Sequence, residues 1–210
     1  MNRSPWVDAS PQSIPSTLRP SAWLQEILEV SRVGLDLGCG SRSVWDITSA
    51  PGSRKLYLLD VNKAAMVSNP SLWGARVCGD IRQLPFGDGT FDTVTANAVL
   101  TALSKRSEYV AAFAELNRIV MADGHLYVGD FLYEPTNSAY RLRYLQEERG
   151  SFYSESQHPG DISYFAKHWT LEELDSMLDS FDRKKFGTRQ AKSRTGHQVT
   201  CFEALYVRKR

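Results

Sequence analysis

The stretch Val33-Gly-Leu-Asp-Leu-Gly-Cys-Gly40 decides how the rest of the chain is interpreted. Its first five residues are mostly apolar, which is typical of a strand buried in a parallel sheet. Gly38 and Gly40 follow, and glycine lets the backbone approach a ligand where a Cβ would collide. We therefore expect a buried strand that ends in a ligand-binding loop.

The same alternation continues along the chain. Short apolar segments are separated by helix-sized segments, a pattern that favours parallel βαβ units with helices on both faces of the sheet. A capping box opens a late helix at Thr170. The expected strands are residues 33–37, 55–60, 75–80, 91–97, 125–131, 181–187 and 199–207, with a basic loop at 188–198. The predicted fold is therefore α/β and doubly wound.

Polar side chains stand at the ends of four predicted strands: Asp36, Asp60, Asp80 and Asn97. In an open α/β sheet, ligands bind beyond the carboxyl ends of the strands. Asp60 is placed to accept hydrogen bonds from two ribose hydroxyls, and Asp80 from the exocyclic amine of an adenine. These positions predict a site for an adenosine-containing ligand.

Four ordered motifs carry a family resemblance: residues 33–40, 58–60, 79–96 (GDIRQLPFGDGTFDTVTA) and 116–125. Together they resemble class I S-adenosylmethionine-dependent methyltransferases, and most closely the small-molecule group similar to ubiquinone and menaquinone C-methyltransferases. The resemblance implies a Rossmann-like, mostly parallel seven-stranded sheet with a small lid insertion. It also implies S-adenosyl-L-methionine as cofactor, S-adenosyl-L-homocysteine as product, and cofactor contacts from Asp36, Gly38, Cys39, Gly40, Asp60, Val61, Asp80, Ile81 and Asn97.

One position departs from the family pattern. Arg42 stands where a further glycine is common, and it cannot easily adopt a positive φ. Arg42 either reaches the methionine carboxylate of the cofactor or faces solvent, and the helix after it should be short. The alternative ligand, a nicotinamide dinucleotide, is disfavoured because Asp36 would repel a pyrophosphate.

The segments outside the motifs suggest an acceptor pocket. Residues 1–20 contain four prolines and predict a mobile arm, whereas 21–210 predict one methyltransferase domain with a lid or substrate insertion at about 132–169. The insertion is rich in aromatic residues, and we expect helical pieces within it. Candidate pocket walls are Trp6, Trp23, Tyr133, Tyr153 and Tyr164, and His158 and His168 are the candidate bases, although an isolated histidine is more often structural.

Composition narrows the function classes. The 210 residues carry a net charge of +1, and three scattered cysteines with no zinc spacing indicate a reduced, cytoplasmic setting without a metal. No apolar run suits a membrane helix. A small-molecule acceptor in a biosynthetic pathway is favoured, and nucleic acid is disfavoured because the N/D-P-P-Y motif is missing after the fourth strand. Two alternatives stay open: an RNA or protein methyltransferase that uses the basic residues after Phe181, and a non-catalytic binding protein.

Overall fold

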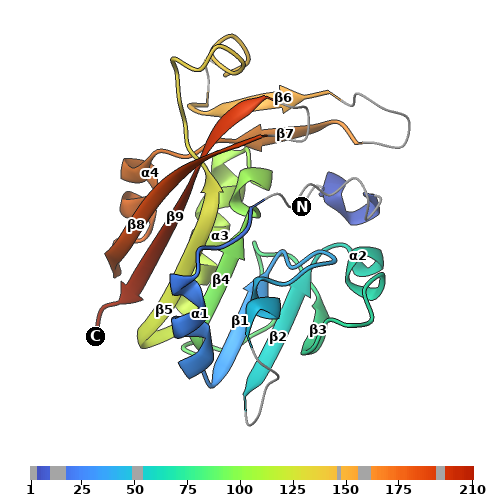
Figure 1. The fold of residues 1–210 in the computed structure, drawn as a ribbon, viewed down its shortest axis with the longest axis vertical. Helices are drawn as coiled ribbons and strands as arrows, with labels where there is room; N and C mark the ends of the chain where they lie inside the picture. Colours follow the sequence, from blue (N-terminus) through green and yellow to red (C-terminus); the bar gives the residue numbers. More distant parts are fainter. Residues whose placement is uncertain (1–3, 10–17, 49–53, 146–147, 156–161, 193–196) are drawn as a thin grey trace.

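The computed structural model describes residues 4–9, 18–48, 54–145, 148–155, 162–192 and 197–210. Its centre is a seven-stranded sheet in the order β3-β2-β1-β4-β5-β9-β8, which confirms the predicted fold class (Figure 1). The first five strands are parallel, and the last two are antiparallel. The strands are β1 (Val33–Leu37), β2 (Lys55–Asp60), β3 (Ala75–Cys78), β4 (Phe91–Asn97), β5 (Val120–Phe131), β8 (Phe181–Lys192) and β9 (Gln198–Arg208).

Helices cover both faces of this sheet. One face packs on α3 and α4, because their apolar side chains share a core with Leu35 and Leu37 of β1. The opposite face packs on α1, whose Leu24 and Leu28 join a second core around Trp45. The helices are α1 (Trp23–Val30), α2 (Lys63–Val67), α3 (Arg106–Ile119) and α4 (Leu171–Met177), and the 3-10 turns are η1 (Pro5–Asp8), η3 (Val44–Ile47) and η4 (Leu100–Ala102).

The connection after β1 is short, as the sequence predicts. In place of the short helix, its described residues form the 3-10 turn η3, which Ser43 caps by accepting a hydrogen bond from the Trp45 N–H. Trp45 fills the space beside Gly34, where a Cβ would lie 2.2 Å from the indole ring. Arg42 is exposed at the start of this turn, and a glycine at its position is not required because Gly38 and Gly40 supply the positive φ angles.

The insertion at 132–169 differs from the prediction of helical pieces. It contains a second, two-stranded antiparallel sheet of β6 (Ser151–Ser154) and β7 (Tyr164–Lys167). Turns within residues 137–144 precede it, held by backbone bonds such as Arg143 N–H to the Tyr140 carbonyl at 2.8 Å. Within β6, Phe152 is buried and its neighbour Tyr153 is exposed, because successive side chains of a strand point to opposite faces. Figure 1 shows this small sheet beyond the carboxyl ends of β1 and β4.

The predicted basic loop at 188–198 is a second correction. Residues 188–192 continue β8 and pair with β9 as far as Lys192–Gln198. Two arginines of β8 are neutralised: Arg183 pairs with Asp175, and Arg189 lies 3.5 Å from Glu203. Charge had suggested a loop, but an exposed edge strand tolerates charged side chains equally well. No helix in the described ranges is long and apolar enough to span a membrane.

Candidate active site

A cavity of about 390 Å³ opens beyond the carboxyl ends of the parallel strands. Its volume lies within the range of about 300–1,000 Å³ that is usual for small-ligand sites. One side, the floor, comes from the strand ends: Gly38, Asp60, Val61, Asp80 and Ile81. The opposite side, the roof, comes from the turn at 137–144 together with β6 and β7. The cavity is therefore enclosed by segments far apart in sequence.

Asp60 is the best-prepared polar group of the floor. It ends β2 and is nearly buried, and each carboxylate oxygen accepts one backbone N–H: Oδ2 from Gly40 and Oδ1 from Asn62, both at 2.8 Å. Burial raises the pKa of Asp60 despite these bonds. A carboxylate has about four lone-pair sites. Asp60 therefore keeps lone-pair capacity to accept a hydrogen bond from a ligand.

Asp80, the second carboxylate of the floor, has a different environment. Arg82 donates to both of its oxygens, with Nη2 2.6 Å from Oδ2 and Nε 2.9 Å from Oδ1. Burial alone would raise the pKa of Asp80, but the bonds and charge of Arg82 outweigh it, so the pKa is lowered. Arg82 also contacts Glu108 at 3.1 Å. Asp80 therefore has its oxygens largely satisfied within the protein.

Gly38 lets the backbone of the floor lie close to the side chain of Val99. It has a φ of +66°, and a Cβ there would lie 2.5 Å from Cγ2 of Val99. Its N–H and that of Cys39 both donate to the carbonyl of Leu59, which ties the loop to the end of β2. Cys39 and Gly40 stand in the loop but do not line the cavity.

Asp36 and Asn97 lie behind the floor, although the sequence suggested ligand contact. Asp36 is buried and accepts bonds from the Ser43 hydroxyl at 2.7 Å and the Thr95 hydroxyl at 2.8 Å; burial raises its pKa to about 7. Asn97 donates to the carbonyl of Leu18 at 2.9 Å, whereas its buried Oδ1 has no partner among the described residues. Asp36 thus holds the loop rather than lining the cavity.

The roof is mainly aromatic. Tyr140, Phe152 and Tyr164 line it together with His168, whose ring centroid lies 4.7 Å from that of Tyr140 and 4.8 Å from that of Phe152. Burial lowers the pKa of His168 to about 3, so its imidazole is neutral. Nδ1 of His168 lies 2.9 Å from the hydroxyl of Tyr144. These rings make an apolar box with one polar corner.

The N-terminal turn η1 closes the side of the cavity. Trp6 lines it and packs on Tyr164 with ring centroids 4.5 Å apart. The amide of Asn62, just after β2, donates to the carbonyls of Trp6 at 2.9 Å and Ala9 at 2.7 Å. The turn therefore connects the floor to the roof.

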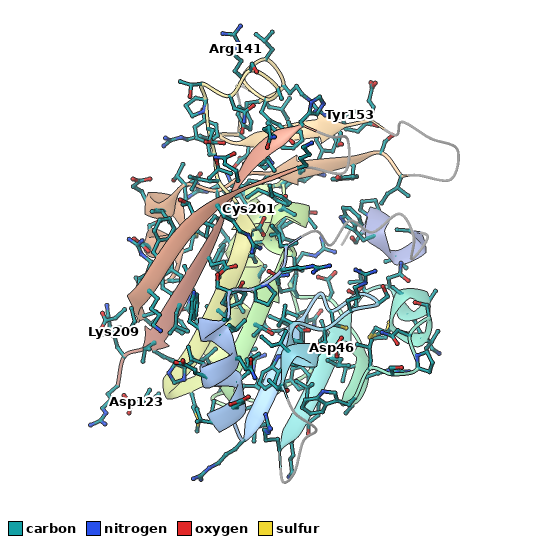
Figure 2. All side chains as sticks on the ribbon, viewed as in Figure 1. Asp46, Asp123, Arg141, Tyr153, Cys201 and Lys209 are labelled. Atoms are coloured by element: carbon teal, nitrogen blue, oxygen red, sulfur yellow. The ribbon has the colours of Figure 1, made fainter. Side chains whose placement is uncertain are left out.

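The structure brings some of the predicted pocket residues together and leaves others apart. Trp6, Tyr164 and His168 line the cavity, whereas Trp23, Tyr133 and Tyr153 do not. Trp23, the first residue of α1, instead packs on Tyr127. Tyr153 is exposed on the outer side of the small sheet (Figure 2). His158 lies outside the described residues.

Two functional-looking residues escaped the sequence analysis. Arg143 lines the roof, and the spacing Tyr140-x-x-Arg143 within a turn is the signal that could have placed both on one side. Asp130 ends β5 fully buried and accepts the backbone N–H groups of Thr101 at 2.9 Å and Phe131 at 2.8 Å. Burial raises the pKa of Asp130 to about 7. It fixes the turn that carries the lining residue Thr101.

The floor residues lie in a part of the chain that is similar to known proteins. Residues 35–128 match the family model of a methyltransferase domain, which spans β1 to β5 and every floor residue. Residues 35–128 therefore resemble a methyltransferase domain. No curated protein sequence matches the chain significantly.

Solved structures of methyltransferases share the fold of this chain. An S-adenosylmethionine-dependent methyltransferase from Methanosarcina mazei is 23% identical, with a TM-score of 0.80 over 91% of this chain and 99% of that chain. The N-methyltransferase NodS from Bradyrhizobium japonicum, solved with S-adenosylhomocysteine, is 15% identical, with a TM-score of 0.60 over 89% and 83%. The 1,6-didemethyltoxoflavin N1-methyltransferase of Burkholderia thailandensis, solved with its substrate and S-adenosylhomocysteine, is 13% identical, with a TM-score of 0.61 over 98% and 81%.

The floor can be tested for its fit to S-adenosylmethionine, the cofactor that the sequence resemblance implies. Asp60 keeps lone-pair capacity for a ribose hydroxyl, and Gly38 lines the cavity with backbone alone because Val99 occupies the position of a Cβ. Val61 and Ile81 offer an apolar lining for a base. Asp80 fits its expected role poorly, because Arg82 already occupies its oxygens. The ribose region fits, and an adenine contact with Asp80 requires Arg82 to shift.

Proposed function

We propose that the chain transfers a methyl group from S-adenosylmethionine to a small aromatic or apolar molecule held under the roof. The supporting observation is the single cavity that is lined by Asp60 at the floor and by Tyr140, Phe152 and Tyr164 at the roof. A cofactor on the floor and an acceptor in the aromatic box would share this enclosed space. The toxoflavin methyltransferase, a structure of similar fold, acts on a small aromatic molecule.

In this proposal Asp60 holds the ribose, and the loop of Gly38, Cys39 and Gly40 follows the methionine part. Val61 and Ile81 lie beside the adenine. Asp36 supports the loop from behind through Ser43, and Asn97 offers its unpartnered Oδ1 near the same end of the sheet. When bound, S-adenosylmethionine supplies a methyl group already activated by its sulfonium. The protein must orient the acceptor and keep water out.

His168 is proposed to orient the acceptor rather than to remove its proton. A base is most effective when its pKa lies near the working pH, and the pKa of His168 is lowered to about 3 by burial. A neutral imidazole in contact with Tyr144 can instead form a hydrogen bond to the acceptor. Water is excluded on one side by Trp6 and Tyr164, which close together at the edge of the cavity.

The test is methyl transfer from cofactor labelled on its methyl group. Purified protein is incubated with a panel of small aromatic acceptors, with total RNA and with a protein mixture, and the labelled product is separated by size. We expect label in a small molecule. Label in RNA or protein would contradict the small-molecule acceptor, and binding of S-adenosylhomocysteine without any transfer would favour a binding protein.

A further inference from the structure

The roof contains one feature that the aromatic box does not explain, the guanidinium of Arg143. Arg143 is the only formally charged residue among the described residues that line the roof. It lies over two rings of the box, with its Cζ 5.6 Å from the centroid of Tyr140 and 5.1 Å from that of Phe152. A cation is therefore built into the wall of an otherwise apolar compartment.

Within the described part of the chain, Arg143 has no carboxylate partner. Its printed hydrogen bond, from Nη2 to the carbonyl of Tyr153, is long at 3.4 Å. Arg82, the other arginine that lines the cavity, shows the contrast, because it pairs with Asp80 at 2.6 Å and Glu108 at 3.1 Å. A partly buried cation that no described carboxylate neutralises favours an anionic ligand.

The neighbours of Arg143 also suit an anion. His168 is buried and neutral, and the nearby charge of Arg143 is one cause of its lowered pKa. Tyr144 lies next to His168 and brings a neutral hydroxyl to this corner. Neither group brings a negative charge that would repel a carboxylate. The corner therefore combines a fixed cation with neutral hydrogen-bonding groups.

We propose that the acceptor is an aromatic carboxylate whose ring fills the box of Tyr140, Phe152 and His168 and whose carboxylate pairs with Arg143. This inference rests on the proposed function, since it names the substrate class of the same cavity. The planar guanidinium matches a carboxylate in a two-point contact. The two rings beneath it restrict its orientation, so that less freedom is lost on binding.

The experiment compares acids with their uncharged amides. Benzoate and 2-naphthoate, and the corresponding primary amides, are titrated by calorimetry into protein saturated with S-adenosylhomocysteine. We expect each acid to bind the wild type about 10- to 100-fold more tightly than its amide, the range given by hydrogen bonds to charged groups. In Arg143→Gln this preference should disappear, and Arg143→Lys should retain part of it.

Arg141→Gln is the matched control. Arg141 stands on the same turn but is exposed and projects outward from the molecule (Figure 2), so the acid preference should persist in this variant. The inference is overturned if amides bind as tightly as acids, if the preference survives Arg143→Gln, or if no acid binds at millimolar concentration. If the wild type fails to bind S-adenosylhomocysteine, the proposed function fails separately, and the same titrations on the protein alone still decide the carboxylate site.

Discussion

The floor and the roof of the cavity differ in how they are built. The floor consists of strand ends, and its main group, Asp60, is held by two backbone N–H groups at 2.8 Å. The roof consists of side chains from a turn and a small separate sheet, packed ring against ring around His168. Backbone geometry thus fixes the proposed cofactor side, whereas side-chain packing shapes the proposed acceptor side. A change in the floor should reduce cofactor binding, and a change in the roof should alter acceptor choice.

The largest effect is expected from Asp60→Ala. The variant removes the carboxylate from the proposed ribose site and leaves the N–H groups of Gly40 and Asn62 without their acceptor. Affinity for S-adenosylhomocysteine should fall about 100-fold or more, on the order of 3 kcal/mol, when measured by calorimetry. Asp123→Asn, at the opposite end of the sheet in Figure 2, is the control and should bind normally. Normal binding by Asp60→Ala would show that Asp60 does not hold the ribose.

A smaller effect is expected from Gly38→Ala. The new Cβ would meet Val99 at 2.5 Å, and alanine is strained at a φ of +66°. We expect a loss of about 2 kcal/mol in stability together with weaker cofactor binding. Gly187→Ala is the matched control, because nothing lies within 4 Å of its Cβ position. Urea denaturation of both variants decides the point: equal stability would show that the loop adapts freely.

The buried carboxylates predict a pH dependence. Burial raises the folded-state pKa of Asp130 to about 7 from an ordinary value of 3.8, so its contribution to stability is present below the unfolded pKa and is lost as the pH rises through about 7. Asp130→Asn should be less stable overall, and its free energy of unfolding should fall less between about pH 4 and 7, by up to about 1.4 kcal/mol per pH unit. Urea denaturation across this range measures the slope, and an unchanged slope would contradict the shift. Asp123→Asn should leave the slope as in the wild type.

The difference between the two regions also explains what the sequence could predict. Gly38, Asp60 and Asp80 follow apolar runs, and the topology of parallel strands then brings their ends together, so the floor was predictable. The pairing of Asp80 with Arg82 was not, because a local ion pair gives no periodic signal. In the roof, Tyr153 was expected as a wall and Phe152 is one instead. The two residues point to opposite faces of a strand, and the prediction of helical pieces in this segment does not make that distinction.

The smallest effect is expected on the outer edge strand β8. Lys184→Ala combined with Lys192→Ala removes two exposed cations that lie outside the cavity. Turnover of a small acceptor should change less than about twofold, since exposed charges contribute little. A large loss of turnover, strongly dependent on salt, would instead indicate that these cations hold an anionic macromolecule.

A crystal structure with bound S-adenosylhomocysteine tests most directly that one cavity serves cofactor and acceptor. We predict the ribose hydroxyls on Asp60 and the sulfur facing the space between Tyr140, Phe152 and His168. A ligand bound elsewhere, or with its sulfur turned away from those rings, would contradict the shared cavity.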